Sequence, residues 1–365
     1  MNIELNVLDR QYNMYKNDYD KAVLEVLESG YYIMGPRLEC FESHYSKYLN
    51  IKYCVGLNSG LDALVLAIRA LDLSEGDEII VPANTYIATV LGITENGAKP
   101  VFVEPNEYYN IDPNKIEAYI TEKTKAILVV HLYGQTCEMD KIIEISKKHH
   151  LYLLEDCAQS HGAKYKGKMT GTFGDIGCFS FYPTKNLGAF GDAGAIVTNN
   201  IDLYNKIKML RNYGSNKKYY FEYEGINSRL DEVQAALLDI KLSHLDELTS
   251  DRKKIANRYL DEIKNDNIIL PLVQVNCEHV WHLFVIRTKE RNKFQQYLLD
   301  NGIKTQIHYP IPPHLSKCYE GLDYKKGDFP ITEKYSNDII SLPLYNFMTD
   351  DEISYVVEIV NKYKG

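Results

Sequence analysis

The chain has 365 residues, which is enough to bury a large core and to form about two lobes. Apolar residues make up 45% and charged residues 25% of the chain, which excludes a disordered, collagen-like or coiled-coil protein. The net charge of −9 at pH 7 argues against a nucleic-acid partner, because a general nucleic-acid surface needs a basic face.

The chain begins with MNIELNVLDRQYN, which is acidic and polar, whereas a signal peptide begins with a basic and then an apolar stretch. No apolar run approaches the length of a membrane span. The seven cysteines are odd in number and include no CxxC pair, which favours reduced, mostly buried thiols over a disulfide framework or a zinc site. We therefore expect a cytoplasmic protein without a membrane partner and without a metal.

Two helical patterns, at about 18–29 and 37–49, flank the Gly35–Pro36 break and predict an N-terminal helical extension. From about 52 to 200, helical patterns alternate with the strand-like runs KYCVGL, EIIVPA, KPVFVE, KAILVVHLYG and LYLLED. This alternation predicts a mainly parallel sheet with helices on both faces. Ligands bind such sheets at the carboxyl ends of the strands.

The helical run RLDEVQAALLDIKLSHLDEL and a second helix to about 265 predict a link between two lobes. Strand-like HVWHLFVIR, a helix, GIKTQIHYP and a terminal helix then predict a small α+β lobe. We divide the chain into an extension (1–50), a large domain (51–245), and a linking helix with a small C-terminal domain (246–365).

Lys185 lies in FGDIGCFSFYPTKNLGAFGDAGAIVTN, where glycine-rich turns surround two strand-like runs. This pattern predicts a constrained turn, and a lysine on a rigid scaffold can form an imine with a carbonyl compound. A single lysine is more often a solvated surface charge, so the assignment depends on other residues.

The apolar run LYLLED ends at Glu155 and Asp156. A carboxylate buried at a strand end is costly unless a cation or a donor meets it, and a protonated pyridine nitrogen is one such cation. The simpler alternative is that one of the two acids caps a following helix.

A third motif, VGLNSGLDALVLAIRA, predicts a short strand, a Ser59–Gly60 turn and a helix. Free amides at the helix start, a hydroxyl and a glycine that permits close approach can bind phosphate. Ser180 could supply a second hydroxyl. The signal is weak alone, because such turns are also common as plain helix caps.

Six motifs together resemble the sugar aminotransferase family of fold-type I pyridoxal-phosphate enzymes, in the family's order and over nearly the whole chain: NSGLDAL, PANTYIAT, HLYGQ, EDCAQSHGA, FSFYPTKNLGAFGDAG and GINSRLDEVQAA. Within that family they are most similar to the dTDP-3-keto-6-deoxyhexose 3-aminotransferases. The resemblance implies an α/β fold with a large cofactor-binding lobe, 51–245, and a smaller C-terminal lobe. One departure is Ala193, where the family more often has glycine.

The resemblance implies pyridoxal 5′-phosphate as the cofactor, with the pyridoxamine form between two half-reactions. Lys185 would be the catalytic, imine-forming lysine. Asp156 would pair with the ring nitrogen, Gln159 would lie near the phenolic oxygen, and Tyr86 would stack on the ring. The residues that match the family's phosphate binders are Ser59, Gly60, Ser180 and, from a neighbouring subunit, Asn227. The active site would therefore require a homodimer.

The implied reaction moves an amino group from L-glutamate to C3 of a dTDP-linked 3-keto-6-deoxyhexose. A lysine at 185, where related dehydratases have histidine, favours transamination. The alternatives are amination at C4 of a nucleotide-linked 4-keto-6-deoxyhexose and, in another class, a regulator that keeps the cofactor fold without turnover. The candidate sugar or pyrophosphate contacts are His161, Tyr182, His308 and Tyr309, each of which could equally be a packing residue.

Overall fold

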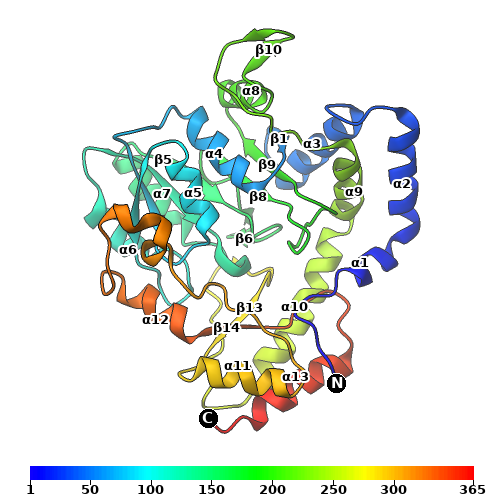
Figure 1. Ribbon diagram of the computed structural model, residues 1–365, viewed down its shortest axis with the longest axis vertical. Helices are drawn as coiled ribbons and strands as arrows, with labels where there is room; N and C mark the ends of the chain where they lie inside the picture. The colour runs from blue at the N-terminus through cyan, green and yellow to red at the C-terminus, as the bar shows by residue number, and fades with distance from the viewer.

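Figure 1 shows the computed structural model, which describes residues 1–365 as a large lobe built on a sheet and a smaller lobe below it. The seven strands of the large sheet follow the order β1-β9-β8-β5-β4-β2-β3. They are β1 (Tyr53–Leu57), β2 (Glu78–Pro82), β3 (Lys99–Val103), β4 (Thr124–Val130), β5 (Tyr152–Asp156), β8 (Ile176–Ser180) and β9 (Gly194–Thr198). The pairs from β3 to β8 are parallel, and β9 is antiparallel to both of its neighbours. The predicted mainly parallel α/β sheet is confirmed.

The large sheet is buried on both faces, because its strands are continuous apolar runs. In β2, Ile79 and Val81 enter one hydrophobic core, whereas Ile80 enters the core on the opposite face. This alternation follows from the two-residue period of a strand. The helices that follow these strands are α4 (Gly60–Ala70), α5 (Ile87–Thr94), α6 (Pro113–Ile116), α7 (Met139–Lys148) and α8 (Ile201–Leu210).

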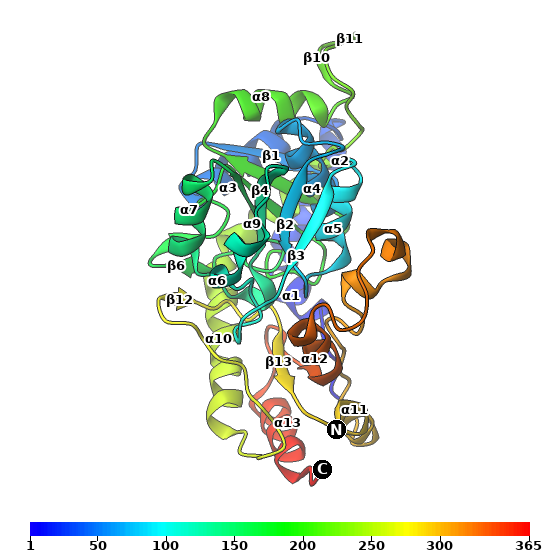
Figure 2. The same cartoon turned by 90° about the vertical axis from the view of Figure 1, so that its left-hand side faces the viewer.

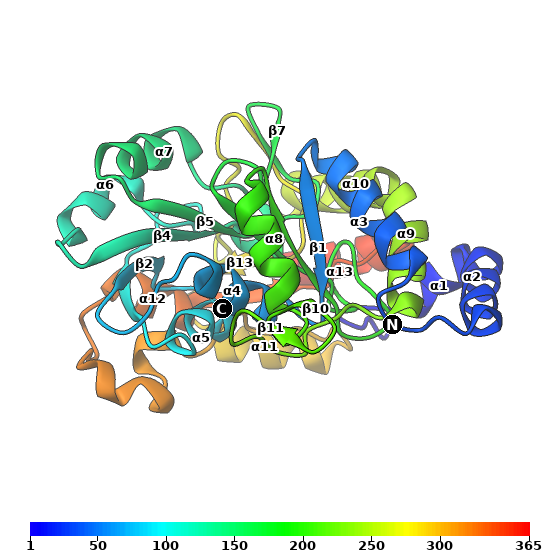
Figure 3. The ribbon, with the colours of Figure 1, turned by 90° about the horizontal axis from the view of Figure 1, so that it is seen from above.

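Two N-terminal helices, α2 (Lys16–Ser29) and α3 (Pro36–Leu49), pack against α9 (Glu232–Ser243) (Figure 3). The short helix α1 (Asp9–Met14) contacts α2. The buried Glu232 carboxylate accepts hydrogen bonds at 2.8, 2.8 and 3.0 Å from the N–H groups of Gly35, Arg37 and Leu38. A carboxylate of one helix therefore caps the positive end of another.

The C-terminal lobe begins with α10 (Leu245–Glu262) and contains the antiparallel pair β13 (Phe284–Arg287) and β14 (Ile339–Leu342). The helices around this pair are α11 (Arg291–Asp300), α12 (Pro330–Asp338) and α13 (Asp350–Lys362). Ile3 forms a bridge to Ile303 and packs into the core of this lobe. The first residues of the chain therefore belong to the C-terminal lobe, whereas α2 and α3 pack against α9. The domain boundaries stay a prediction.

Two strand-like runs of the C-terminal region form less strand than their sequences suggest. Only the last four residues of HVWHLFVIR are extended, because Val280 and Leu283 donate to the carbonyls of Gly134 and Tyr133 instead of a sheet partner. GIKTQIHYP contributes only two isolated bridges, from Ile303 to Ile3 and from Gln306 to Ser341. Both segments thereby approach the carboxyl edge of the large sheet.

The remaining elements are short. The small strands are β6 (Lys164–Tyr165), β7 (Lys168–Met169) and β12 (Cys277–Glu278) in one sheet, and β10 (Ser215–Lys217) and β11 (Tyr220–Phe221) in another. Figure 2 shows the β10–β11 hairpin projecting away from the body of the chain. The 3-10 turns are η1 (Glu117–Tyr119), η2 (Leu132–Gly134), η3 (Pro313–Leu315) and η4 (Lys317–Leu322). No helix combines the length and apolar character needed to cross a membrane.

Arg252 connects α10 to the segments that enter the C-terminal lobe. Its guanidinium donates to the carbonyl oxygens of Trp281, His282 and Leu344 at 2.8, 2.7 and 3.0 Å. The side chain is buried, and that burial lowers the arginine pKa to about 10. One side chain thus satisfies three buried carbonyl groups from two segments.

Arg252→Met should lower the free energy of unfolding by at least about 3 kcal/mol, because three buried carbonyls lose a charged donor while the apolar stem is kept. The shift in the urea unfolding midpoint measures this loss. Arg258 on the same helix is the control, since its partners Glu262 and Asp350 are partly or fully exposed. Arg258→Met should cost less than about 1 kcal/mol, and equal losses would contradict the role given to Arg252.

Candidate active site

A cavity of about 560 Å3 opens at the carboxyl edge of the large sheet, between the two lobes. The lining residues from the sheet lobe include Ser59, Gly60, Tyr86, Thr89, Asp156, Gln159, Ser180, Tyr182 and Lys185. The smaller lobe contributes His282, Gln306, His308 and Tyr309. The cavity lies at the edge where parallel sheets bind ligands.

Lys185 follows β8 in a turn whose backbone is held on several sides. Its N–H donates to the carbonyl of Tyr182 at 2.8 Å. Asn186 donates to Val280 O at 2.9 Å, and the buried Lys241 of α9 donates to Gly188 O at 3.1 Å. Burial lowers the Lys185 pKa to about 8, and Asp156 opposes that shift. About a tenth of the amine is therefore unprotonated at pH 7, far more than for a lysine with the ordinary pKa.

Asp156 is buried at the end of β5 and lines the same cavity. Oδ2 accepts from Thr89 Oγ1 at 2.8 Å, and Oδ1 accepts from Ala158 N at 3.1 Å. Burial raises the Asp156 pKa, while the Thr89 hydrogen bond and the Lys185 charge act in the opposite direction. A cation in the cavity would complete this site, because a buried carboxylate needs a partner.

Thr89 was not predicted from the sequence. It stands three residues after Tyr86, at the first turn of α5, and residues three apart share a helix face. The spacing of PANTYIAT could therefore have indicated that both side chains point toward the same site.

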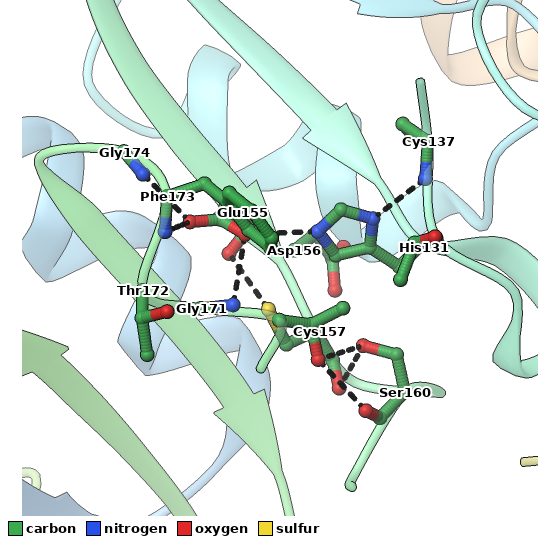
Figure 4. A network of polar contacts seen from close by, with 12 residues as sticks. His131, Cys137, Glu155, Asp156, Cys157, Ser160, Gly171, Thr172, Phe173 and Gly174 are labelled. Atoms are coloured by element: carbon green, nitrogen blue, oxygen red, sulfur yellow. Dashed lines mark hydrogen bonds and ion pairs between the residues drawn. The ribbon is translucent and has the colours of Figure 1, made fainter. Parts of the chain in front are cut away.

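Glu155, next to Asp156 on β5, points to the opposite side of the sheet, as strand alternation requires (Figure 4). Its fully buried carboxylate accepts at 2.7 to 2.8 Å from the backbone N–H groups of Gly171, Phe173 and Gly174. Irregular chain follows β5, so the expected helix cap is wrong. Asp156 accepts a hydrogen bond within its own turn, from Ala158 N. Glu155 instead holds the turn at 171–174.

His131 completes the Glu155 network from the end of β4. Its Nδ1 accepts from Cys137 N at 3.1 Å, so the ring hydrogen is on Nε2, which donates to Glu155 at 3.0 Å. The His131 backbone N–H donates to the Asp156 carbonyl at 3.1 Å. The network therefore joins the strand ends that border the cavity.

Three of the predicted phosphate binders, Ser59, Gly60 and Ser180, line the cavity side by side. Ser59 is the N-cap of α4, and its Oγ accepts from Asp62 N at 3.0 Å. A Cβ on Gly60 would lie 2.4 Å from Cβ of Ser180, so only glycine lets the helix start approach β8 this closely. Two serine hydroxyls and the free amides of α4 thus converge, as an anion site requires.

Gln159 and two tyrosines border the cavity. Gln159 Oε1 accepts from Tyr133 N at 2.7 Å, and its Nε2 donates to Tyr309 Oη at 3.1 Å. The rings of Tyr86 and Tyr309 pack at a centroid distance of 4.9 Å. Tyr86 is half exposed, so its ring stands at the mouth of the cavity and is available for stacking.

The structure separates the four candidate substrate residues. Tyr182, His308 and Tyr309 line the cavity. His161 does not: its ring is fully buried at 5.5 Å from those of Phe179 and Phe181, and neither ring nitrogen has a partner. Burial lowers the His161 pKa to about 3. The aromatic core takes up this side chain, so the geometry gives no support to a direct substrate contact.

Asn227 also lies outside the cavity of its own chain. It is exposed, and its backbone forms a bridge with Asn212. This placement leaves its side chain available to a second copy of the chain.

His282 and Gln306 line the cavity but were not predicted as site residues. His282 Nδ1 approaches Asn186 Oδ1 at 3.2 Å, whereas His279, three residues earlier, stacks on Trp281 at a centroid distance of 3.8 Å. Gln306 carried no sequence signal, since its segment reaches the site only through packing of the smaller lobe.

The chemistry of these groups fits pyridoxal 5′-phosphate. The cavity presents an anion site at one end, an amine able to react with an aldehyde, and a buried carboxylate suited to a protonated ring nitrogen. Because Gly60 has no side chain, the start of α4 can lie close to Ser180 without a clash. The fold and the site together define a fold-type I aminotransferase.

Comparison with known proteins gives the family. Residues 13–361 match the model of the DegT/DnrJ/EryC1/StrS aminotransferase family, and the chain belongs to that family. A curated relative, dTDP-3-amino-3,6-dideoxy-α-D-galactopyranose transaminase of Aneurinibacillus thermoaerophilus, is 54% identical over 97% of this chain and 98% of its own.

Two solved structures extend the comparison. DesV of S. venezuelae, in complex with a ketimine intermediate, matches with a TM-score of 0.97 and 42% identity over 99% of this chain and 98% of its own. NtdA of Bacillus subtilis, with bound cofactor PMP, matches with a TM-score of 0.92 and 34% identity over 98% of this chain and 84% of its own. The predicted family and fold class are confirmed.

Cofactor uptake should follow the Lys185 titration, because only an unprotonated amine attacks an aldehyde. The folded-state pKa is lowered to about 8 from 10.5, so the reactive fraction rises as pH increases through 8 and levels off above it. The rate of yellow colour formation, when pyridoxal phosphate is added to cofactor-free protein, measures this profile.

The Lys185→Ala protein is the control for reaction at other lysines and should show no such rise. A wild-type profile that rises only toward pH 10.5, the ordinary lysine value, would contradict the assignment of a perturbed amine.

Proposed function

We propose that this protein transfers an amino group from L-glutamate to C3 of a dTDP-linked 3-keto-6-deoxyhexose, with pyridoxal phosphate as cofactor. The observation that carries the proposal is that Lys185 and Asp156 line one cavity, together with Ser59 and Gly60 at the start of α4. The 54% identity to a curated dTDP-3-amino-sugar transaminase supports C3 as the position of amination.

Pyridoxal phosphate, when bound, supplies an aldehyde that takes up the amino group and an electron-poor ring that stabilises charge at the adjacent carbon. The Asp156 carboxylate would hold a protonated ring nitrogen, because the ion pair relieves the burial of both charges. Ser59, Gly60 and Ser180 would bind the phosphate. Hydrogen bonds to Tyr133 on one side and Tyr309 on the other hold the Gln159 side chain in place. Gln159 would lie near the phenolic oxygen of the cofactor.

Lys185 Nζ moves the proton in both halves of the reaction. It would remove a proton from Cα of glutamate in the first half and would deliver a proton to C3 of the sugar in the second. A pKa of about 8 suits this task, since the amine can both accept and donate a proton near neutral pH. The amino donor and the keto sugar use the cavity in turn.

The sugar end of the cavity offers neutral groups. Burial lowers the His308 pKa to about 4, so its ring is uncharged at neutral pH, with Nδ1 2.8 Å from Ser341 Oγ. Tyr182 and Tyr309 add a hydroxyl and an aromatic face each. Such groups suit the hydroxyls and the apolar face of a deoxysugar.

A homodimer is part of the proposal, with Asn227 reaching the phosphate of the partner's site. Two groups of exposed apolar side chains support an interface. One group is the α2–α3 connection, Tyr31, Tyr32, Ile33 and Met34, and the other is the β10–β11 hairpin with Tyr219, Tyr220 and Phe221. Tyr86 and Tyr182 are also half exposed at the cavity mouth, which a second chain would cover.

We place the protein in the cytoplasm. All seven cysteines are unpaired thiols, and four of them are buried. Free thiols are typical of a reducing compartment.

Product regiochemistry tests the substrate. With L-glutamate and a dTDP-4-keto-6-deoxyhexose, the pure protein should give an aminated sugar only when a ketoisomerase supplies the 3-keto form, with the amine at C3 by NMR. An amine at C4 without the isomerase would keep the cofactor chemistry and assign the chain to the alternative 4-amination. The Lys185→Ala protein should fold and give no product in either case, and turnover without Lys185 would overturn the mechanism.

Subunit mixing tests the shared site. Lys185→Ala and Asn227→Ala homodimers should each be weak or inactive, but their mixture, after subunit exchange, should recover about a quarter of wild-type activity. Half of the mixed dimers are heterodimers, and each of these combines Lys185 of one chain with Asn227 of the other in a single intact site. No recovery above the parent proteins would place Asn227 outside the partner's site.

A further inference from the structure

A second cluster of reactive side chains lies on the surface between α3 and α9, outside the cavity. Cys40 and His44 are four residues apart on α3 and therefore share a helix face. Asp239 of α9 faces them, with Oδ1 2.7 Å from His44 Nδ1. Cys40 Sγ lies 3.7 Å from His44 Nδ1 and 3.9 Å from Asp239 Oδ2.

These separations are close to those between the ligand atoms of a tetrahedral metal. With metal–sulfur bonds near 2.3 Å and metal–nitrogen or metal–oxygen bonds near 2.1 Å, a tetrahedron places S···N and S···O pairs about 3.6 Å apart and N···O pairs about 3.4 Å apart. For Asp239 Oδ1 to bind the ion, its 2.7 Å contact with His44 Nδ1 must open by about 0.7 Å. One ligand atom from each of the three residues already lies within 4.8 Å of the other two, and the half-exposed His44 ring has room to rotate.

We propose that Cys40, His44 and Asp239 bind a divalent ion of the zinc type, with water as the fourth ligand. A thiolate, an imidazole and a carboxylate are ligands that zinc and cobalt(II) accept in tetrahedral sites. Burial and the Asp239 carboxylate raise the Cys40 pKa, so the thiol is protonated without metal. The incoming ion displaces that proton to solvent, and no oxidant or reductant is involved.

The other cluster of metal-ligand side chains, His131, Glu155 and Cys157, is unsuited to an ion even though its donor atoms are equally close. His131 Nδ1 already accepts a backbone N–H, and its Nε2 already donates to Glu155. Both Glu155 oxygens are engaged by backbone N–H groups. The α3–α9 cluster differs because its groups bond mainly to one another and its His44 and Asp239 side chains reach solvent.

An ion at this site would cross-link α3 to α9. The same helices are already joined at the start of α3 by the buried Glu232 carboxylate. Metal binding should therefore stabilise the folded chain, by an amount that rises with the logarithm of the free ion concentration above the dissociation constant, without contact with the cavity.

Cobalt(II) titration of the untagged, cofactor-loaded protein in a non-thiol reductant tests the proposal. Tetrahedral thiolate coordination should give visible bands at longer wavelength than the yellow cofactor band, saturating at one ion per chain and bleached by zinc. Cys40→Ser should abolish the bands, and His44→Gln and Asp239→Asn should weaken binding by at least about tenfold. Transaminase turnover should be unchanged in all three variants, because the three residues lie outside the cavity. The cobalt bands are read without turnover, so this test of the metal site does not depend on the proposed function.

Cys318→Ser is the matched control, since Cys318 is the exposed thiol of the chain, and it should leave the bands intact. Zinc should raise the melting temperature of the wild type and of Cys318→Ser but not of Cys40→Ser. Absent bands at millimolar cobalt, bands that survive in Cys40→Ser, or loss of the bands in Cys318→Ser would each overturn the site.

Discussion

Burial of two ionisable groups in one cavity is the constraint on which the active site depends. Asp156 and Lys185 come from the ends of neighbouring strands, and burial shifts their pKa values in opposite directions, toward the neutral form of each. Each charge partly restores the other, yet the carboxylate still lacks a close cationic partner among the protein groups that bond to it. A cofactor with a cationic ring and a reactive aldehyde resolves both deficits.

Neighbouring residues on β5 divide the work between the two faces of the sheet. Asp156 faces the cavity. Glu155, on the opposite face, forms hydrogen bonds to His131 and to the backbone of the turn that contains Gly171 and Phe173. The network also contacts the Asp156 backbone through His131 N–H. This hydrogen-bonded network behind the strand keeps the Asp156 carboxylate at a fixed position. Electrostatic catalysis requires such fixed charges.

The helices beside the sheet connect the site to the rest of the molecule. α9 supplies Lys241, which holds the Lys185 turn, and Glu232, which caps α3. Asn227, which we propose to reach the partner's site, lies shortly before α9 in the chain. The proposed metal ligands lie on the outer side of this helix pair, where an ion would affect stability rather than chemistry.

The sequence by itself determined the strands and the motif residues, because buried parallel strands are short apolar runs and the key groups follow them directly. Lys185, Asp156 and Ser59 could be assigned in this way, since each depends on a local strand-to-turn pattern together with the family resemblance. Tertiary packing decided the rest. It drew His161 into an aromatic core, brought His282 and Gln306 to the cavity from the smaller lobe, and set Asp239 beside Cys40 across 199 residues of chain. Contacts between distant segments leave no periodic signal in the sequence, because they depend on how whole elements pack and not on the spacing of neighbours.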